Sequence, residues 1–223
     1  MPVKAIRIHE DGGPEVLRYE DAPDPVPGTG QVLIALRAAS LNHLDVWVRR
    51  GLPSVPKPRI LGADGAGVVV SGDGFEPGER VVINPGIDHG DGRIIVIGEH
   101  TDGTHAELIS VPASQVYRIP DELDFESAAA FPLVFETAYR MLVTKARLQA
   151  GEWVLVWGVG GGVATAACRG TRGPTGTRFC ASGSSSSGRG SAASTASSST
   201  RTSTSTARRL CARVSGSTAR TRC

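Results

Sequence analysis

The chain has 223 residues, of which 40% are hydrophobic and 21% charged, and a formal net charge of +2. All four cysteines lie at or beyond Cys168, so the preceding sequence excludes a disulfide framework and a thiolate metal site. The first residues lack the basic start and apolar stretch of a signal peptide, and no apolar run is long enough to cross a bilayer. We therefore expect a cytoplasmic protein without a membrane partner.

Short apolar segments separated by Gly, Pro and Asp follow one another in the first 118 residues. Alternating apolar and polar residues predict a half-buried strand at 3–8, and a buried run predicts another at 31–38. Further extended segments are expected at 16–19, 68–70, 80–83, 93–97 and 106–109, with a short helix at 42–50. Many short strands with turns between them favour a barrel or a sandwich, so residues 1–118 should be mostly β.

The pattern changes after Pro120. An Ala-rich segment begins at Asp124 and is broken by Pro132, and the spacing of apolar residues then predicts a helix over 136–148. Residues 153–157 (WVLVW) form a continuous apolar run. Such a run is typical of a strand buried on both faces of a parallel sheet.

That run leads directly into the glycine-rich segment GVGGGVA, residues 158–164. A strand, a tight glycine turn and a helix N-terminus form the phosphate-binding element of dinucleotide folds, because the glycines let the pyrophosphate approach the backbone. A plain turn is the alternative, and the preceding buried run favours the cofactor interpretation. The candidate cofactor-binding residues are Gly158, Gly160, Gly161, Gly162, Val163 and Ala164.

Residues 168–223 differ in composition from the rest of the chain. They contain ten Arg and no Asp, Glu or Lys, which leaves 14 basic and 22 acidic residues before Cys168. A dinucleotide fold needs a second strand and an acidic residue about 20 positions after the glycines, but the sequence near residue 180 offers neither. We expect a disordered, low-complexity tail and no nucleic-acid partner, because its basic residues do not lie on a folded surface.

The tail consists mainly of Ser, Thr, Arg, Gly, Ala, Pro and Cys. GC-rich coding DNA yields these residues when it is read in the wrong frame, and the composition switches close to the glycine motif. Our hypothesis is a frameshift near codons 164–168, which would leave this chain truncated and inactive. A flexible arm that binds nucleic acid is the functional alternative.

Several segments resemble the medium-chain dehydrogenases, the superfamily of zinc-type alcohol dehydrogenases and quinone oxidoreductases. The resemblance covers residues 3–167 and is carried by GGPEVLRYED, LRAASLNHLDVWVRRG, ILGADGAGVVV, FEPGERVV, GEHTDGTHAEL, IPDELDFESAAAFPLVFETAYRML and VLVWGVGGGVATAA. It implies an α/β chain of two domains. A β-rich, chaperonin-10-like (GroES-like) catalytic domain would occupy 1–120. The connecting helix, first strand and glycine loop of an incomplete Rossmann domain would occupy 121–167, and the tail 168–223.

In zinc-dependent members of that superfamily a Cys, a His and a further Cys or Asp hold a catalytic zinc. The matching positions in this sequence are Asn42, Ala63 and Leu133. The segment of the four structural-zinc cysteines is also shortened, to NPGIDHGDGRIIVIG. The chain is therefore more similar to the zinc-free quinone or enone reductases, which implies NADPH or NADH as cofactor, a small-molecule substrate and, in intact relatives, a homodimer.

By the same resemblance, Asn42 and Thr137 would lie near the nicotinamide and Asp45 would organise the loop of Asn42. Each has a structural alternative. Asn42 is a favoured residue for capping the following helix. In the structural alternatives Asp45 only stabilises the fold, and Thr137 is an ordinary residue at the start of a helix.

Six other polar residues invite a metal-site interpretation: His89, His100, His105, Asp88, Asp91 and Asp102. Their spacing matches no standard ligand motif and the segment is rich in turns, so we expect a solvated loop. Two alternatives to the zinc-free oxidoreductase remain open. One is a zinc-type alcohol dehydrogenase whose metal positions are misaligned here, and the other is a non-catalytic β-domain with a basic, disordered arm.

Overall fold

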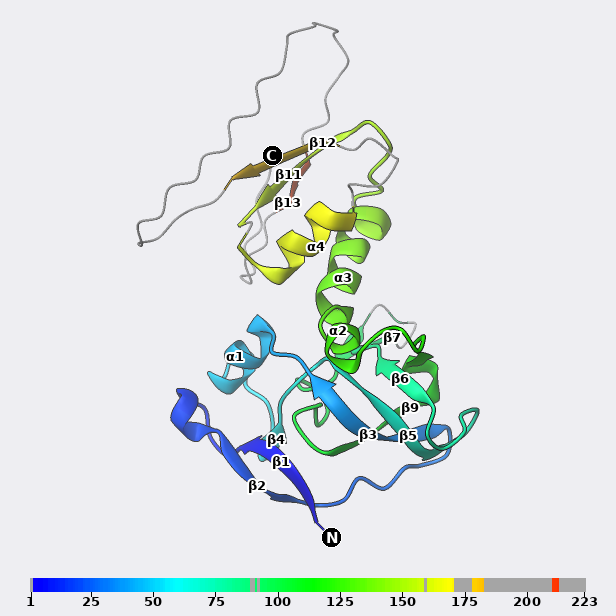
Figure 1. Ribbon diagram of the computed structural model, residues 1–223. Coiled ribbons are helices and arrows are strands. Elements are labelled where there is room, and N and C mark those ends of the chain that lie inside the picture. Colours follow the sequence, from blue (N-terminus) through cyan, green and yellow to red (C-terminus); the bar gives the residue numbers. More distant parts are fainter. Residues whose placement is uncertain are drawn as a thin grey trace, which may run out of the picture. The chain divides into compact units, whose positions relative to one another are not determined.

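The computed structural model describes residues 2–88, 91, 93–158, 160–170, 178–182 and 210–212, the last two segments by their backbone. The chain divides into two compact units, Met1–Leu133 and Val134–Cys223. Each unit has its own sheets and its own apolar core (Figure 1).

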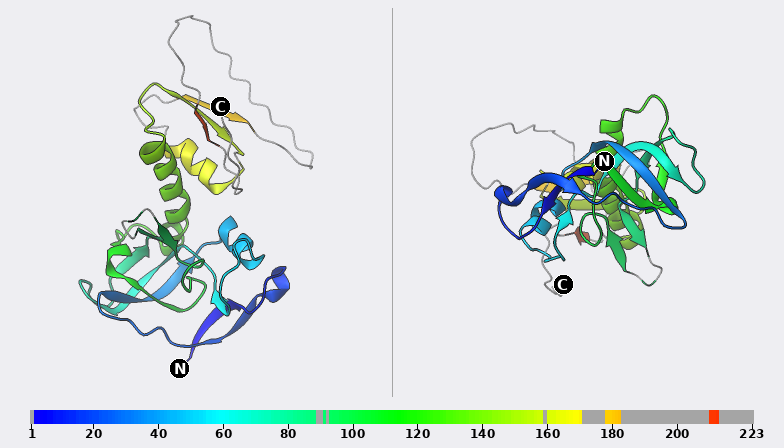
Figure 2. Two further views of the ribbon diagram at one scale, coloured as in Figure 1. Left: turned by 180° about the vertical axis from the view of Figure 1, so that it is seen from behind. Right: turned by 90° about the horizontal axis from the view of Figure 1, so that it is seen from below.

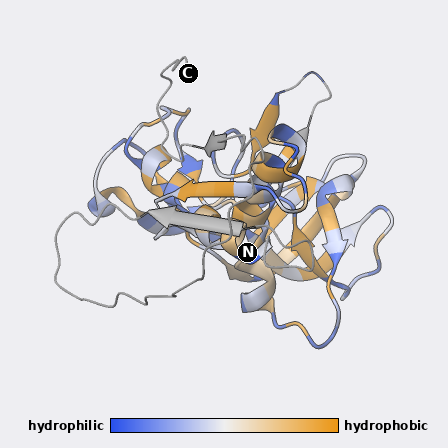
Figure 3. Cartoon of the chain, turned by 90° about the horizontal axis from the view of Figure 1, so that it is seen from above, coloured by the Kyte–Doolittle hydropathy of each residue, from blue (hydrophilic) through white to orange (hydrophobic). Residues whose placement is uncertain are grey.

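The first unit is built around a five-stranded antiparallel sheet with the strand order β10-β6-β5-β3-β9. Its strands are β3 (Gln31–Ala39), β5 (Gly65–Gly72), β6 (Arg80–Ile83), β9 (Leu108–Pro112) and β10 (Val116–Arg118). Strand β3 pairs with β5 on one side and with β9 on the other. Inward-facing Val and Ile side chains of these strands form the main core, and Figure 3 shows hydrophobic residues concentrated along the strands.

Two smaller sheets complete the β-structure of this unit. Strand β1 (Val3–Ile8) pairs antiparallel with β2 (Arg18–Ala22) and with β4 (Arg59–Ile60), and the β1–β2 pair is dark blue in Figures 1 and 2. Strands β7 (Gly86–Asp88) and β8 (Ile94–Val96) form a two-stranded sheet.

Short helices cover parts of the first unit. The 3₁₀ turns are η1 (Pro14–Val16) and η2 (Ala113–Gln115), and the α-helices are α1 (His43–Arg49) and α2 (Phe125–Ala129). Asp124 caps the N-terminus of α2, because its carboxylate accepts a hydrogen bond from the amide of Ser127. The fully buried Ala128 and Ala129 pack against residues of β5 and β6, which fixes the helix on the large sheet.

The second unit centres on the strand β11 (Trp153–Trp157). Helix α3 (Pro132–Tyr139) starts within the last two residues of the first unit and continues as a π-helical segment, η3 (Arg140–Lys145). Helix α4 (Gly162–Gly170) follows β11. The core residues are Ala138, Leu142, Val154, Val156, Ala164, Ala166 and Ala167.

Most elements that the sequence predicted are present. The expected strand 80–83 coincides with β6 and the expected strand 153–157 with β11, and residues 1–118 are mostly β as predicted. The expected helix 136–148 is wrong at both ends, because the helical segment begins at Pro132 and ends at Lys145. Proline fits the first helical turn, where its fixed φ is favourable and no amide donor is needed.

The expected absence of a strand near residue 180 is also wrong. Strands β12 (Arg178–Ser182) and β13 (Leu210–Ala212) pair in parallel with the two edges of β11. Pairing uses backbone amides and carbonyls, which any composition supplies, and β11 offers both of its edges. The disorder of the tail stays a prediction, and 171–177, 183–209 and 213–223 lie outside the described residues.

Within the described ranges, no helix combines the length and the apolar character that crossing a membrane requires.

Candidate functional site

The polar centre of the first unit is Asp64, which follows β4 and precedes β5 and has no exposed surface. One carboxylate oxygen accepts hydrogen bonds from the side-chain amide of Asn42 at 2.9 Å and from the Ser40 hydroxyl at 3.1 Å. The other oxygen accepts from the backbone amide of Leu133 at 2.8 Å. The carboxylate of Asp64 is therefore hydrogen-bonded both to the residue that precedes α1 and to the first turn of α3.

The backbone carbonyl of Asp64 is bonded as well. It accepts from the Thr104 hydroxyl at 2.8 Å and from the amide of Ser40 at 3.2 Å. Ser40 in turn accepts, through its own carbonyl, a hydrogen bond of 3.2 Å from Nε2 of His105. A carbonyl can only accept, so Nε2 of His105 carries a proton.

Burial is the strongest influence on the charge of Asp64. It raises the pKa of the Asp64 carboxyl above its ordinary value of 3.8, because the charged form is poorly solvated. The hydrogen bonds from Asn42, Leu133 and Ser40 favour the charged form and oppose that rise, and the nearby carboxylate of Asp45 adds to it.

Asp45 lies on the first turn of α1 and is 5% exposed. One of its carboxylate oxygens accepts from the amide of Asn42 at 2.7 Å, and the other accepts from the amide of Gly62 at 3.0 Å. Asp45 thus joins the start of α1 to the loop before Asp64. Both site candidates of this unit, Asn42 and Asp45, belong to one buried network.

The three positions that the resemblance assigned to zinc ligands converge in this network. Asn42 and Leu133 both donate to Asp64, and Ala63 is its buried neighbour in the chain. Ala63 and Leu133 have no side-chain donor atom for a metal, and the amide nitrogen of Asn42 is engaged by Asp64. These residues do not fit a catalytic zinc. Among the described residues, no group of three His, Cys, Asp or Glu side chains could hold a metal ion.

The polar residues of the turn-rich segment have separate structural partners. The carboxylate of Asp102 accepts from the amide of Ile60 at 3.0 Å, and Nδ1 of His100 accepts from the amide of Val96 at 3.1 Å. Asp91 accepts from the amide of Arg93 at 2.9 Å. His89 and the side chain of Asp88 lie outside the described residues.

The second unit contains the glycine turn between β11 and α4. Gly158 has a φ of +79°, and its carbonyl accepts from the amide of Gly161 at 3.3 Å. A Cβ atom at Gly158 or at Gly160 would meet no atom of the described residues within 4 Å. The turn therefore has an open backbone in front of the first amides of α4, and it fits a phosphate group.

The remaining candidates of that unit have defined places. A Cβ atom at Gly162 would lie 2.8 Å from Cγ1 of Val134, so α4 approaches α3 closely there. Ala164 is buried, and Val163 is packed against the same core. Thr137 is half-buried on α3.

Asp64 is not among the site residues predicted from the sequence, although it lies in the segment ILGADGAGVVV that carries the resemblance. A charged residue within the apolar run ILGADGAGVVV was the available signal, since a buried acid must be hydrogen-bonded or paired. The role of Asp45 as organiser of its loop stays a prediction from the resemblance, and its carboxylate accepts two backbone hydrogen bonds in the structure.

Residues 28–121 match the family model of the alcohol dehydrogenase GroES-like domain. The chain is similar to quinone oxidoreductases of Homo sapiens and Lama guanicoe. It is 37% identical to the first over 174 residues, which is 75% of this chain and 49% of that protein. It is 38% identical to the second over 175 residues, which is 75% of this chain and 48% of that protein.

Solved structures of alcohol dehydrogenases and quinone oxidoreductases are also similar to this chain. A crystal structure of an NAD-dependent alcohol dehydrogenase matches with a TM-score of 0.74 and 42% identity, over 82% of this chain and 58% of that one. A quinone oxidoreductase of Pseudomonas syringae pv. Tomato matches with a TM-score of 0.69 and 32% identity, over 80% and 52%.

The chain spans about half the length of the curated relatives that it matches. The β-rich first unit and the ordered set of matching segments nevertheless confirm the resemblance drawn from the sequence. The chain belongs to the medium-chain dehydrogenase/reductase superfamily, among its quinone oxidoreductase and alcohol dehydrogenase-like members, and contains a GroES-like domain.

Proposed function

We propose that this family member is an NAD(P)H-dependent, zinc-independent oxidoreductase that transfers hydride to a quinone or to an activated carbonyl or alkene. The observation that carries the proposal is the open glycine turn between β11 and α4, which fits a dinucleotide phosphate. The names of the relatives, quinone oxidoreductase and NAD-dependent alcohol dehydrogenase, support the same chemistry.

In this proposal the side chains bind and orient, and the bound nicotinamide supplies the hydride. The backbone amides at Gly160 and Gly162 bind the pyrophosphate, the amide of Gly161 closes the turn by its bond to the carbonyl of Gly158, and Val163 and Ala164 hold α4 in place behind them. Asn42 and Thr137 contact the nicotinamide or the substrate. Asp45 acts as a positioning residue, because its carboxylate holds the amide of Asn42.

Zinc independence rests on the donor atoms available around Asp64. An asparagine amide bonded to a buried carboxylate occupies the site where a metal would need thiolate or imidazole ligands. Substrate activation must then come from hydrogen bonds and from alignment with the nicotinamide. The homodimer and the cytoplasmic location stay predictions.

We also propose that the tail from Cys168 is an out-of-frame product and that the chain as written does not turn over. The test starts with sequencing codons 155–223 and translating all three frames. The proposal predicts that another frame continues with an apolar helix, a strand and an acid near position 180. Recovery of the written tail from the genome, or robust NADPH oxidation with 1,4-naphthoquinone by the written chain, would refute it.

Cofactor binding is then measured on the protein in the recovered frame. Titration with NADPH and NADH, followed by nicotinamide fluorescence, should show saturable binding of at least one of them. Gly160→Glu should abolish it, because the new carboxylate enters the open side of the turn and repels the pyrophosphate. Gly28→Glu, at an exposed glycine of the first unit, is the matched control and should bind normally. Binding that survives Gly160→Glu would argue against the dinucleotide site.

A further inference from the structure

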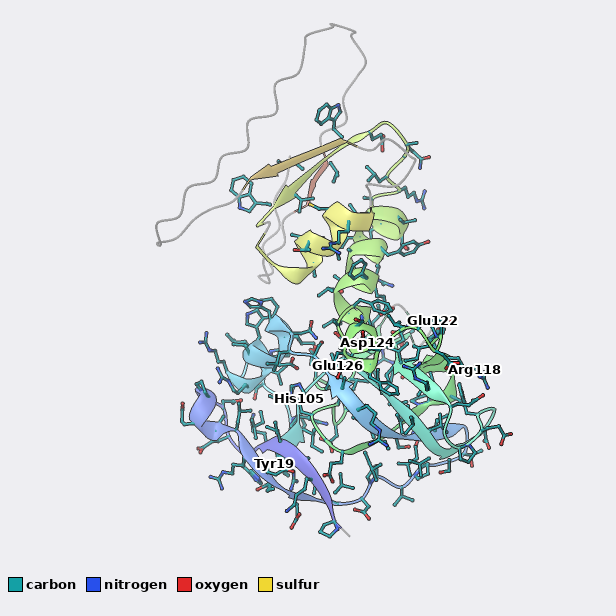
Figure 4. All side chains as sticks on the ribbon, in the orientation of Figure 1. Tyr19, His105, Arg118, Glu122, Asp124 and Glu126 are labelled. Atoms are coloured by element: carbon teal, nitrogen blue, oxygen red, sulfur yellow. The ribbon has the colours of Figure 1, made fainter. Side chains whose placement is uncertain are left out.

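The first unit contains a cavity of about 660 Å³, which Asp45, the positioning residue of the proposed function, lines in part. Its walls come from β1, β3, α1 and the 104–107 segment, and they are mainly aliphatic. The apolar lining residues are chiefly Ile6, Leu17, Leu36, Leu41, Val46 and Leu61. His105, labelled in Figure 4, belongs to the same lining. A volume of this size and an apolar wall with a few polar groups are typical of small-molecule sites.

Two cations line this cavity, the exposed Arg37 and the buried Arg49. The carboxylate of Glu15 interacts electrostatically with Arg49 but forms no salt bridge with it. Arg49, at the end of α1, lines the cavity and is only 7% exposed. Its Nε atom is buried and has no hydrogen-bond partner, and the described part of the chain provides no salt bridge to its guanidinium. Burial of a charged group is costly unless an opposite charge or a set of acceptors compensates it.

The acids that line the cavity do not supply that compensation. Both carboxylate oxygens of Asp45 accept from backbone amides, those of Asn42 and Gly62. Glu107 accepts from the amide of Lys4 through one oxygen. The guanidinium of Arg49 therefore keeps donors for a group that enters the cavity.

We propose that this cavity binds a small aliphatic carboxylate, with the carboxylate on Arg49 and the hydrocarbon body against the leucine-rich wall. A guanidinium presents its donors in a planar fork that matches the two oxygens of a carboxylate. The hydrocarbon body would cover side chains that are now exposed, above all Leu41 at 83% and Leu17 at 40%. Asp45 lines this cavity but Asn42 and Asp64 do not, and the proposed ligand is a second molecule beside the substrate of the proposed reaction.

Isothermal titration of the full chain with octanoate, 1-octanol and octylamine tests the proposal. Octanoate should bind at one site per chain, and the alcohol and the amine should each bind at least about tenfold more weakly, because they cannot form the charged pair. Equal affinity for octanoate and octanol would overturn the role of Arg49. Absence of octanoate binding would overturn the site.

Two pairs of variants locate the ligand. Arg49→Gln should weaken octanoate binding at least about tenfold, while Arg50→Gln, at the exposed next residue, should leave it unchanged. Thermal unfolding checks that the buried substitution leaves the protein folded. Leu41→Gln removes apolar wall at an 83% exposed position and should also weaken binding, whereas Val26→Gln, at an 85% exposed position outside the cavity, should not. Equal losses within either pair would contradict the assignment.

Discussion

The side-chain amide of Asn42 lies 2.9 Å from a carboxylate oxygen of Asp64, a residue with no exposed surface. This bond joins the residue before α1 to the residue before β5, across 22 positions of the chain. Removal of Asp64 leaves the half-buried amide of Asn42 without its acceptor, and removal of Asn42 takes one of three donors from the buried carboxylate. Buried polar groups without a partner cost more free energy than an average hydrogen bond contributes.

Asp64→Ala should lower the free energy of unfolding by about 3 kcal/mol, because it leaves the donors of Asn42, Ser40 and Leu133 without their acceptor. Urea unfolding followed by circular dichroism measures the change. Asp121→Ala, at a carboxylate whose side chain is 96% exposed, is the control and should change stability little. Similar losses of unfolding free energy for both variants would mean that the buried hydrogen bonds of Asp64 add no more stability than an exposed carboxylate does.

The raised pKa of Asp64 predicts a specific pH dependence of stability. The folded state holds the Asp64 proton more tightly than the unfolded chain, whose pKa is near 3.8. The stability that Asp64 contributes is therefore complete below that value and is lost as the pH rises through the higher folded pKa. Above the folded pKa the contribution is constant.

Comparison with Asp64→Asn isolates this dependence. The difference in unfolding free energy between the unmodified chain and the variant should fall as the pH rises from about 3 and should then level off. Glu20, Glu79 and Asp124 have lowered pKa values and produce the opposite slope, but they are present in both proteins and cancel. A difference that increases with pH would show that the hydrogen bonds outweigh burial at Asp64.

Arg80 should contribute more to stability than Arg118, although each guanidinium lies over a phenylalanine ring. Arg80 lies 4.7 Å from the centre of the Phe125 ring and also donates to three backbone carbonyls in the segment 120–123. Arg118, labelled in Figure 4, has 58% of its side chain exposed and pairs with Glu79. We expect Arg80→Ala to cost about 2 kcal/mol and Arg118→Ala less than about 1 kcal/mol in thermal or urea unfolding. The reverse order would refute the carbonyl contacts as the cause.

Gly162 should tolerate no side chain while Val134 is present. A Cβ atom at Gly162 would lie 2.8 Å from Cγ1 of Val134, so Gly162→Ala should destabilise the second unit by about 1 kcal/mol or more. Val134→Ala opens space, and the double variant should recover part of the loss. Protease protection and unfolding of the two single variants and the double variant give the coupling energy. Additive losses would mean that the two residues do not clash.

The sequence predicted those elements whose signal is local. The bounds of β11 follow from uninterrupted apolar residues, those of β6 from three apolar residues after Arg80, and the start of α1 from Asn42 as a cap. Pro132 was interpreted only as a break, although proline also starts helices, and so α3 was placed four residues late. Strands β12 and β13 carry little side-chain signal, because their pairing with β11 depends on the backbone.

The candidate site depends on contacts between distant positions, and these were harder to predict. Asp64 receives its hydrogen bonds from residues between 22 and 69 positions away. No local periodicity encodes such a set. The unpaired, buried Nε of Arg49 likewise becomes visible only in the folded structure, where the Asp45 carboxylate is bonded to backbone amides.

The bond between the amide of Leu133 and Asp64 also bears on protein synthesis. A ribosome has made the last strand of the large sheet once it passes Arg118. At that stage one oxygen of the Asp64 carboxylate still lacks its donor, because Leu133 has not been synthesised. Residues 119–133 must leave the exit tunnel before that carboxylate is enclosed. A nascent chain released at residue 120 would carry a finished sheet around an incompletely bonded acid, and cellular proteases would degrade it before one that ends at Leu133.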